Sequence, residues 1–491
     1  MRRPVIRLPP RESLTGAERY GLDLLIDLAR VPAVDDAVAD VVRLLVAERD
    51  APDPDLQTCI ARDWYLERGA GIVRVPRVVL RRVMAVAAAA AEQHSAARDR
   101  HGRVPSRENE LVRSALDTDP VVSRAAGRLR AAVIASAERR LVALAAPWPE
   151  GKRWATAFTH DLDVVAFWPL FTLLRLAELG RKRELRRIGG TLLAGLAAVG
   201  RDPVRRAIRE LLDDERRSAV VSTWFVLCGT PTWRTMRAGD LTYRPEGRGA
   251  RAALSALRER GCEINLHGSF ETSDRHALFV EQRRRLAKVI ESSVLGVRQH
   301  FLRMRPGQTM RGMADAGFRY DSTWGFPDRN GFRLGVGDVI PTWDGAGDRA
   351  LDLQEAPVVW MDRALSKYAG VEDPDAWIAE GVSLAEVCRD MNGLWVGVWH
   401  PNLTPPLGFP GAPAAFAALL DRLIALEPYL APLGRLVDWR IARRNVRVRG
   451  ILPDGRPDAY AKVSPPASAT LSLEASGDAG GRRHNIPATP R

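Results

Sequence analysis

Apolar residues recur at helical spacing through the first part of the chain. The segments Leu22–Leu28, Val41–Ala47 and Val78–Ala91 each place apolar side chains three or four positions apart, a pattern that predicts amphipathic helices. The turn-forming residues of Pro147–Gly151 mark a boundary after this part. We therefore predict a mainly helical N-terminal domain at residues 1–148.

After this boundary, short apolar runs rich in β-branched and aromatic residues alternate with amphipathic helical patterns. The runs predicted to be strands are Trp154–Phe158, Ala219–Leu227, Cys262–Leu266, Val294–Val297 and Leu394–Trp399. Strands that alternate with helices in this way pair in parallel. We predict an α/β domain at residues 149–445, a sheet or a barrel. A disordered tail is predicted at residues 464–491, where Ser, Pro, Ala and Gly predominate.

Composition and charge narrow the class of protein. Hydrophobic residues make up 46% of the 491 residues, and the four cysteines are scattered, so neither a disulfide framework nor a cysteine-rich zinc site is expected. The net charge is +13, but the arginines are dispersed and lack interleaved aromatic residues, so we expect no nucleic-acid partner. No apolar stretch suits a membrane span and no secretory signal is visible, so a cytoplasmic protein is expected.

Five segments place Asp, His or Arg directly after apolar, β-prone runs. They are THDLD at 159–163, EINLHGSF at 263–270, GVRQHFLR at 296–303, YDSTWGF at 320–326 and VWH at 398–400. Four of the eight histidines lie in these segments. A (β/α) barrel carries its functional residues at the carboxyl ends of its strands, so these carboxylates and imidazoles are expected to converge. Such a set of donors indicates a metal-assisted hydrolase.

Two aspartates open the series. Asp161 and Asp163 are two residues apart, so at the end of an extended strand both side chains point toward the same cavity. One carboxylate could bind a metal while the other acts as a base; the alternative is that an aspartate caps a helix. His267 follows a strand, with Gly268 behind it to allow a sharp turn, and we favour a metal ligand over a structural histidine.

The later segments add a cation and further titratable groups. Arg298 beside carboxylates would hold a catalytic aspartate ionised, although an ordinary salt bridge is the alternative. His300 could bind the metal, contact substrate or pack. Asp321 begins a turn after a strand. His400 ends a strand, where a histidine with an aspartate partner suits a general acid; the alternative is a buried histidine bonded to a carbonyl group.

The order of these segments resembles that of the polysaccharide deacetylases, the NodB-homology group of metal-dependent carbohydrate esterases (family 4). The resemblance covers about residues 148–440. It implies a distorted (β/α) barrel and a divalent metal, expected to be zinc. In chain order it further implies Asp161 as the catalytic base, Asp163 and His267 as metal ligands, Arg298 as the residue that orients the base, Asp321 near the catalytic acid, and His400 as that acid.

The chain departs from the family pattern at one position. The family's second metal-binding histidine stands four residues after the first, where this chain has Glu271. His300, Glu271 or water would then complete the metal site. A carboxylate ligand suits a divalent metal, although it is harder than imidazole. An inactive member of the family is also compatible with this change.

We predict a hydrolase that removes an N-acetyl group from an N-acetylated sugar or glycoconjugate. Two alternatives stay open: hydrolysis of another non-peptide C–N amide bond on the same fold, and an inactive glycan-binding pseudoenzyme. Tryptophans near the predicted site, among them Trp224, Trp324 and Trp399, could stack on sugar rings, which favours carbohydrate. The N-terminal domain has no comparable segment and is expected to contribute no catalytic group.

Overall fold

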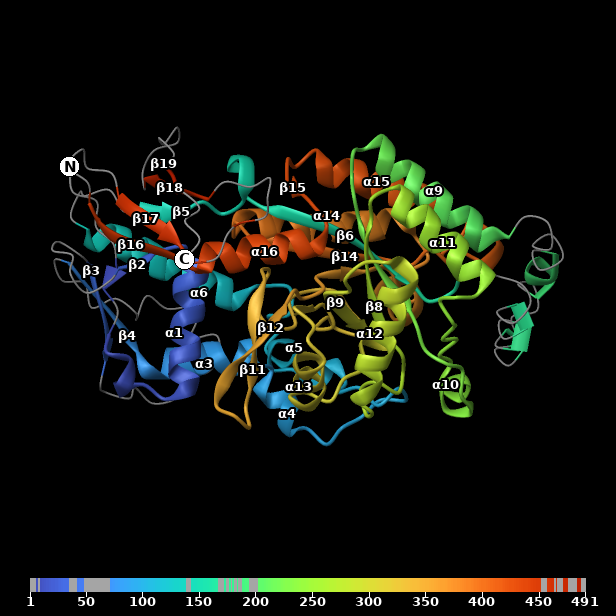
Figure 1. Ribbon diagram of the computed structural model, residues 1–491, viewed down its shortest axis with the longest axis horizontal. Coiled ribbons are helices and arrows are strands. Elements are labelled where there is room, and N and C mark those ends of the chain that lie inside the picture. Colours follow the sequence, from blue (N-terminus) through green and yellow to red (C-terminus); the bar gives the residue numbers. More distant parts are fainter. Residues whose placement is uncertain are drawn as a thin grey trace.

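The computed structural model describes most of the chain, and Figure 1 shows how its elements are arranged. The described residues are 6–7, 9–34, 42–47, 71–137, 143–166, 172–173, 176–177, 179–180, 183, 188–193, 202–451, 457–462, 465, 471–475 and 484–486. Among them, no helix combines the length and the apolar character that crossing a membrane requires.

The larger of the sheets has ten strands and is almost entirely parallel. In pairing order its strands are β11 (Ile340–Asp344), β12 (Arg349–Glu355), β10 (Tyr320–Asp321), β9 (Gly296–Gln299), β8 (Glu263–Gly268), β7 (Thr223–Leu227), β6 (Ala155–Leu162), β14 (Leu394–Trp399) and β13 (Trp360–Met361), with β15 (Tyr429–Leu430) also paired to β6. Within the described strands of this sheet, only β11 and β12 pair in antiparallel orientation. Every residue of β6, β7 and β14 is buried, which explains why these strands are continuous apolar runs.

Helices connect the parallel strands, as the alternation in the sequence predicted. They are α9 (Pro203–Arg217), α10 (Trp233–Ala238), α11 (Arg248–Glu259), α12 (Ala277–Ile290), α13 (Gln308–Asp315), α14 (Pro374–Asp390), α15 (Ala412–Ile424) and α16 (Leu433–Arg444). α9 shows why they pack on the sheet: Val204, Ile208 and Leu211 are buried on one face, while its arginines lie on the other.

The strand pairing does not show a closed barrel. Within the described residues, pairing runs from β11 at one edge to β13 at the other, and no pairing joins these two edges. β10 and β13 are only two residues long, and β12 is covered on its outer side by the antiparallel partner β11. The mixed α/β architecture is therefore as predicted, whereas the distorted barrel is not shown.

A second sheet lies at the left of Figure 1 and includes strands of the N-terminal part, which was predicted to be mainly helical. Its strands, in order, are β17 (Pro457–Ala461), β16 (Val446–Ile451), β2 (Ala33–Val34), β1 (Ile6–Arg7), β3 (Val42–Ala47) and β4 (Ile72–Pro76). Three helices of the N-terminal part lie beside this sheet: α1 (Gly16–Ala29), α3 (Arg77–Ala87) and α6 (Val121–Ser136). Because β16 and β17 follow residue 445, this sheet joins chain from both sides of the predicted catalytic domain.

The segment from Val42 to Ala47 shows why the helical prediction was wrong there. A six-residue apolar run fits a helical spacing and a strand equally well. In the structure Val42 and Leu44 are buried and Arg43 between them is exposed, the alternation of a strand. Parallel partners on both sides, β1 and β4, decide in favour of the strand.

The predicted disordered tail also needs correction. β18 (Ser472–Ala475) pairs with β5 (Ala143–Ala145) and with β19 (His484–Asn485) in a three-stranded antiparallel sheet. Leu471, Leu473 and Ile486 are buried there, so a few apolar residues within the small and polar ones are enough to order these pieces. Apart from Pro465, the rest of residues 464–491 lies outside the described residues.

A buried ion pair joins the N-terminal part to the loop between β10 and β11. Glu92 of α4 (Ala90–His94) is fully buried, and its Oε1 accepts hydrogen bonds from Arg333 Nε (3.1 Å) and from Asn109 Nδ2 (2.7 Å). Arg333 also donates to the carbonyl oxygen of Gly325 at 2.7 Å. The carboxylate and the guanidinium group therefore neutralise each other where water is absent, which buried charges require.

Replacing Glu92 by alanine should lower the free energy of unfolding by about 3–5 kcal/mol, because it leaves the buried Arg333 guanidinium without its carboxylate. Urea unfolding would measure the change. The control is Glu281→Ala, since Glu281 is an exposed residue of α12 and its loss should change stability by less than about 0.5 kcal/mol. Equal effects of the two substitutions would contradict the importance of the buried pair.

Candidate metal and catalytic site

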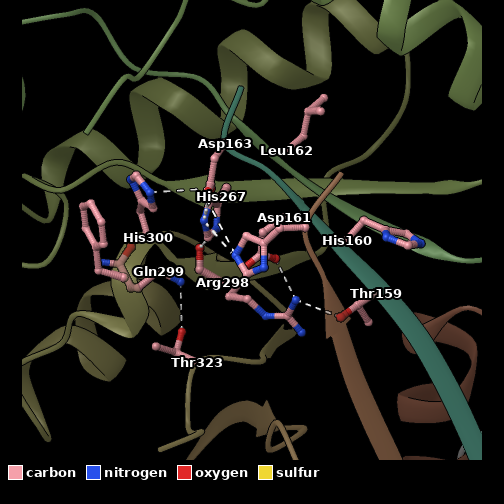
Figure 2. Close-up of polar contacts among 12 residues, drawn as sticks. Thr159, His160, Asp161, Leu162, Asp163, His267, Arg298, Gln299, His300 and Thr323 are labelled. Carbon is pink, nitrogen blue, oxygen red and sulfur yellow. Dashed lines mark hydrogen bonds and ion pairs between the residues drawn. The ribbon is translucent and has the colours of Figure 1, made fainter. Parts of the chain in front are cut away.

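Parallel strand ends bring most of the predicted residues to one place. Asp161 is in β6 and Asp163 follows it; His267 is in β8, Arg298 is in β9, His300 follows β9, and His400 follows β14. Neighbouring parallel strands end at the same edge of a sheet, so these side chains meet there. Figure 2 shows Asp161, Asp163, His267 and His300 directed toward one another.

His160 points away from this group, although it belongs to the same segment as Asp161 (Figure 2). Successive residues of a strand face opposite sides. The His160 ring is buried between the carbonyl oxygen of Trp399, 3.0 Å from Nδ1, and Glu215 Oε1, 2.7 Å from Nε2. It is a structural histidine with both ring nitrogens satisfied.

Asp163, His267 and His300 form a cluster that could hold a metal ion. One ligand atom from each lies within 4.8 Å of the others. Asp163 Oδ1 is 3.2 Å from His267 Nε2 and 3.5 Å from His300 Nε2. This oxygen is buried and accepts no hydrogen bond from the described residues. An unsatisfied carboxylate oxygen between two imidazole nitrogens fits a divalent cation, and one carboxylate with two imidazoles is a donor set that suits zinc.

A hydrogen bond behind His267 and a carboxylate behind His300 leave the inner ring nitrogens available. The Nδ1–H of His267 donates to the carbonyl oxygen of Arg298 at 2.9 Å, so the lone pair of its Nε2 faces Asp163. His300 Nδ1 is 3.2 Å from Asp240 Oδ1. Asp240 is itself held by the backbone N–H groups of Thr242 and Phe270. Both histidines are thus oriented toward one point by groups behind them.

The electrostatics of the cluster agree with this geometry. Burial would raise the pKa of Asp163, but His300, His267 and His400 outweigh it and hold the pKa below its usual range. Burial lowers the pKa of His300, but Asp163 and Asp240 outweigh it and raise the pKa overall. Without a cation, the carboxylate is therefore ionised and attracts positive charge to this point.

Asp161 is held by a fully buried arginine, as the sequence predicted. Arg298 NH1 donates to Asp161 Oδ1 at 2.8 Å and to Thr159 Oγ1 at 2.9 Å. Its other nitrogens donate to the carbonyl oxygen and to the hydroxyl of Ser322 at 2.8 and 2.9 Å. Burial would raise the pKa of Asp161, but Arg298 outweighs it and lowers the pKa. The second oxygen, Oδ2, faces His267 Nε2 at 3.8 Å.

His400 lies across from Asp161 and has a partner that the sequence analysis missed. Its Nδ1 is 2.6 Å from Asp362 Oδ1, and its backbone N–H donates to Asp362 Oδ2, also at 2.6 Å. His400 Nε2 faces Asp161 Oδ2 at 4.0 Å and Asp163 Oδ2 at 3.7 Å. Burial lowers the pKa of His400, but Asp362 and then the other two carboxylates outweigh it and raise the pKa.

Asp321 was expected near His400, but the contacts described for it are with other residues. Asp321 ends β10, and the parallel register places it opposite Glu355 of β12. It accepts a hydrogen bond from the hydroxyl of Thr323. Burial raises the pKa of Asp321 to about 6, and burial together with Asp321 raises the pKa of Glu355. Burial therefore makes both carboxyl groups harder to ionise than an ordinary carboxyl group.

The signal for Asp362 was present in the sequence. Asp362 directly follows the apolar run that contains β13, the same pattern that identified Asp161 at the end of its apolar run. No such pattern marks Asp240 in the sequence, because Asp240 follows the short helix α10. It lies beside His300 only in the folded chain.

Glu271 does not join the metal cluster. Its carboxylate is buried and lies 3.7 Å from Arg234 Nε and 3.6 Å from Arg275 NH1. Of the two protein ligands considered for the third position, His300 is thus the one whose ligand atom lies with Asp163 and His267 in the described residues.

The N-terminal part supports the loop that carries His300. The ring of Phe301 stacks on His300, with centroids 3.9 Å apart, and on its other side His101 stacks at 4.5 Å. Arg103 NH1 donates to the carbonyl oxygen of Phe301 at 3.0 Å. Phe301 has φ of 61°, a conformation that needs such support in a residue with a bulky side chain. The sequence of the N-terminal part did not indicate this role.

Comparison with known proteins identifies solved structures of limited similarity. No protein-family model and no curated protein matches the chain. Matching structures include a protein of Mycobacterium smegmatis described as a polysaccharide deacetylase (21% identity, TM-score 0.40), a probable polysaccharide deacetylase of Pseudomonas aeruginosa PAO1 (17%, 0.39) and PuuE allantoinase (14%, 0.40). Each match covers 59% of this chain and, in the same order, 91%, 92% and 91% of the other. Similarity at this level says nothing about activity, which depends on the site itself.

The choice of third ligand leads to a direct prediction. Replacing His300 by alanine should weaken zinc binding by more than about 100-fold, since even the loss of a group behind a ligand costs about 10–100-fold. The matched substitution Glu271→Ala should leave the zinc affinity within about threefold, because Glu271 lies against arginines instead. Competition with a metal-binding dye would measure both affinities, and the reverse order would assign the ligand to Glu271.

Proposed function

We propose that this protein is a metal-dependent amide hydrolase that removes an N-acetyl group from an N-acetylated sugar or glycoconjugate. The observation that carries the proposal is that two groups with pKa values shifted in opposite directions lie beside the cluster of Asp163, His267 and His300. Arg298 lowers the pKa of Asp161, and Asp362 raises the pKa of His400. A base and an acid that face one cavity from different strands are what hydrolysis of an amide requires.

Asp161 is the proposed base. Arg298 occupies its Oδ1 and lowers its pKa, so Oδ2 is the oxygen that faces the cavity and can accept a proton from water. A bound divalent cation, for which zinc is the best fit to these donors, would polarise the acyl carbonyl group and lower the pKa of a water molecule. Asp161 takes a proton from a water molecule as the oxygen of that molecule adds to the acyl carbon, whether or not a cation assists.

His400 is the proposed acid. Its Nδ1–H is held by Asp362, so its Nε2–H is the proton available to the substrate. When the C–N bond breaks, the leaving nitrogen takes the proton from Nε2 and departs as a neutral amine. The carboxylic acid and the amine are the products, and the proton on Asp161 returns to His400 or to solvent.

The proposed substrate comes from the resemblance of the five segments, because the tryptophans do not help to choose it. Trp224, Trp324 and Trp399 are buried core residues, so they offer no face on which a sugar ring could stack. The acid–base arrangement would serve an acetamido sugar and another non-peptide amide equally well. A panel that contains N-acetylated sugars, glycoconjugates, and linear and cyclic amides therefore tests the proposal.

The zinc-loaded protein should release acetate from at least one N-acetylated member of this panel, and Asp161→Asn should slow this release by about 10²–10⁴-fold while zinc remains bound. The control is Asp315→Asn, an exposed residue of α13, which should leave the rate unchanged. Hydrolysis of other amides without acetate release would favour the alternative C–N hydrolase. Zinc binding with no turnover on any compound would favour a pseudoenzyme.

The partner of His400 predicts a change in pH dependence. The alkaline limb of kcat/KM should report the deprotonation of His400, so activity falls as the pH rises through its raised pKa. Asp362→Asn removes the carboxylate that contributes most to raising this pKa, so the limb should move to lower pH. The acid limb, assigned to Asp161, should stay in place. An alkaline limb that does not move would contradict the role of His400.

A further inference from the structure

Exposed apolar side chains gather beside the candidate site. Of the seven large apolar residues that are exposed in the described part of the chain, five lie in two segments, the connection from β6 to α9 and the helix α10: Leu173, Leu192, Leu193, Trp233 and Met236. The two segments leave the carboxyl ends of β6 and β7, which pair in parallel. They therefore start from the edge of the sheet that carries the candidate site.

The short helix α10, at the lower right of Figure 1, presents its apolar residues to solvent. Trp233 is 71% exposed and Met236 is 48% exposed, while Thr235 is buried. Hydrogen bonds at its two ends hold the helix: the hydroxyl of Thr232 accepts from the backbone N–H of Thr235, and Gly239 ends the helix with φ of 80°. A group of exposed large apolar side chains of this kind marks an interaction surface.

Both segments are connected directly to the candidate site. Asp240, which follows α10, lies 3.2 Å from His300 Nδ1. Arg234 Nε of the same helix lies 3.7 Å from Glu271, and the connection from β6 begins directly after Asp163. Any partner that covers the exposed apolar residues therefore lies beside the metal cluster.

Basic residues accompany the apolar ones. Residues 167–200 contain six basic and two acidic residues, and Arg183 among them is exposed. Arg237 of α10 is exposed as well. Glu271 lies near Arg234, so the positive charge of this surface comes mainly from residues 167–200. Exposed Trp and Leu side chains among basic residues are the combination that binds the interface of a bilayer with anionic lipids.

We propose that α10 and the connection from β6 to α9 dock on the surface of a bilayer that contains anionic lipids, and that the substrate is an amide carried by a lipid. The docking stands by itself, whereas the substrate rests on the proposed hydrolase function. Docking removes the exposed apolar side chains from water and brings the basic residues to the lipid phosphates. It also places the cluster of Asp163, His267 and His300 next to the headgroup layer, where the head group of a lipid-linked sugar lies.

Co-sedimentation of the full-length protein with vesicles tests the docking without any need for activity. Wild type should bind vesicles of equal parts phosphatidylcholine and phosphatidylglycerol, and should bind phosphatidylcholine vesicles more weakly. Trp233→Ser should weaken binding to the mixed vesicles about tenfold or more, because it removes a large apolar side chain from the covered surface. The matched control is Leu295→Ser, which should bind like wild type, since Leu295 is also exposed but directly precedes β9, at the opposite edge of the sheet.

Arg237→Gln isolates the electrostatic contribution. It should weaken binding to the mixed vesicles about fivefold and leave binding to phosphatidylcholine vesicles unchanged. Equal binding of wild type and Trp233→Ser, or no binding to the mixed vesicles, would overturn the docking. A dimer that forms without vesicles in sedimentation velocity and is abolished by Trp233→Ser would overturn it too, because a second copy of the chain would then cover this surface.

Turnover of one N-acetylated head group, offered on a lipid anchor in the mixed vesicles and as the free soluble compound, tests the substrate. Trp233→Ser should lower kcat/KM for the vesicle-borne form about tenfold relative to that for the soluble form, and Leu295→Ser should leave this ratio unchanged. An unchanged ratio in Trp233→Ser would overturn the lipid-linked substrate while the hydrolase function stands. Vesicle binding without turnover of either form would contradict the hydrolase function, and with it the substrate, but not the docking.

Discussion

Two neighbouring carboxylates at the end of one strand determine how the rest of the site is built. Asp161, in β6, is buried, and Asp163, which directly follows β6, is partly exposed but has its Oδ1 buried, so water compensates little of their charge. Buried carboxylates of this kind are costly unless cations or hydrogen-bond donors surround them. β6 lies between β14 and β7, so the partners arrive from both sides: His400 after β14, and His267 and Arg298 from β8 and β9. The parallel order of the strands is thus what makes the charge pair tolerable.

The two carboxylates differ because their neighbours differ. Arg298 occupies one oxygen of Asp161, whereas Asp163 Oδ1 faces two imidazoles and has no hydrogen-bond donor of its own in the described part of the chain. The first arrangement suits a base, and the second suits a ligand. Groups behind the imidazoles complete the division of roles. Asp240 lies behind His300, and Asp362 lies behind His400.

The sequence allowed the strand ends and their order to be predicted, because apolar runs followed by Asp, His or Arg are visible without any knowledge of the fold. Asp362 follows the same pattern and could have been included. The ligand choice between His300 and Glu271 could not be made, since it depends on how the turn after β8 directs Glu271 toward arginines. The pairing of Asp321 with Glu355 could not be predicted, because the register between β10 and β12 is not visible in either strand alone.

Long-range contacts account for the larger errors in the fold. Val42–Ala47 becomes a strand because two parallel neighbours are available, and Leu473 is ordered because β5, more than three hundred residues away, offers an edge. His101 supports Phe301 through the same kind of distant contact. In each case the local pattern was compatible with more than one structure, and tertiary pairing decided between them.

The most direct test of the account is the position of a metal ion in crystals of the protein soaked with zinc, located by anomalous scattering. The account predicts one strong peak bonded to Asp163 Oδ1 and to the Nε2 atoms of His267 and His300, with bonds of about 2.0–2.2 Å. Asp161 should remain paired with Arg298 outside the ligand set. A zinc ion held by Glu271 or His400 in place of His300 would contradict the proposed ligand set. The absence of an ion at this position in crystals soaked at a saturating zinc concentration would contradict it too.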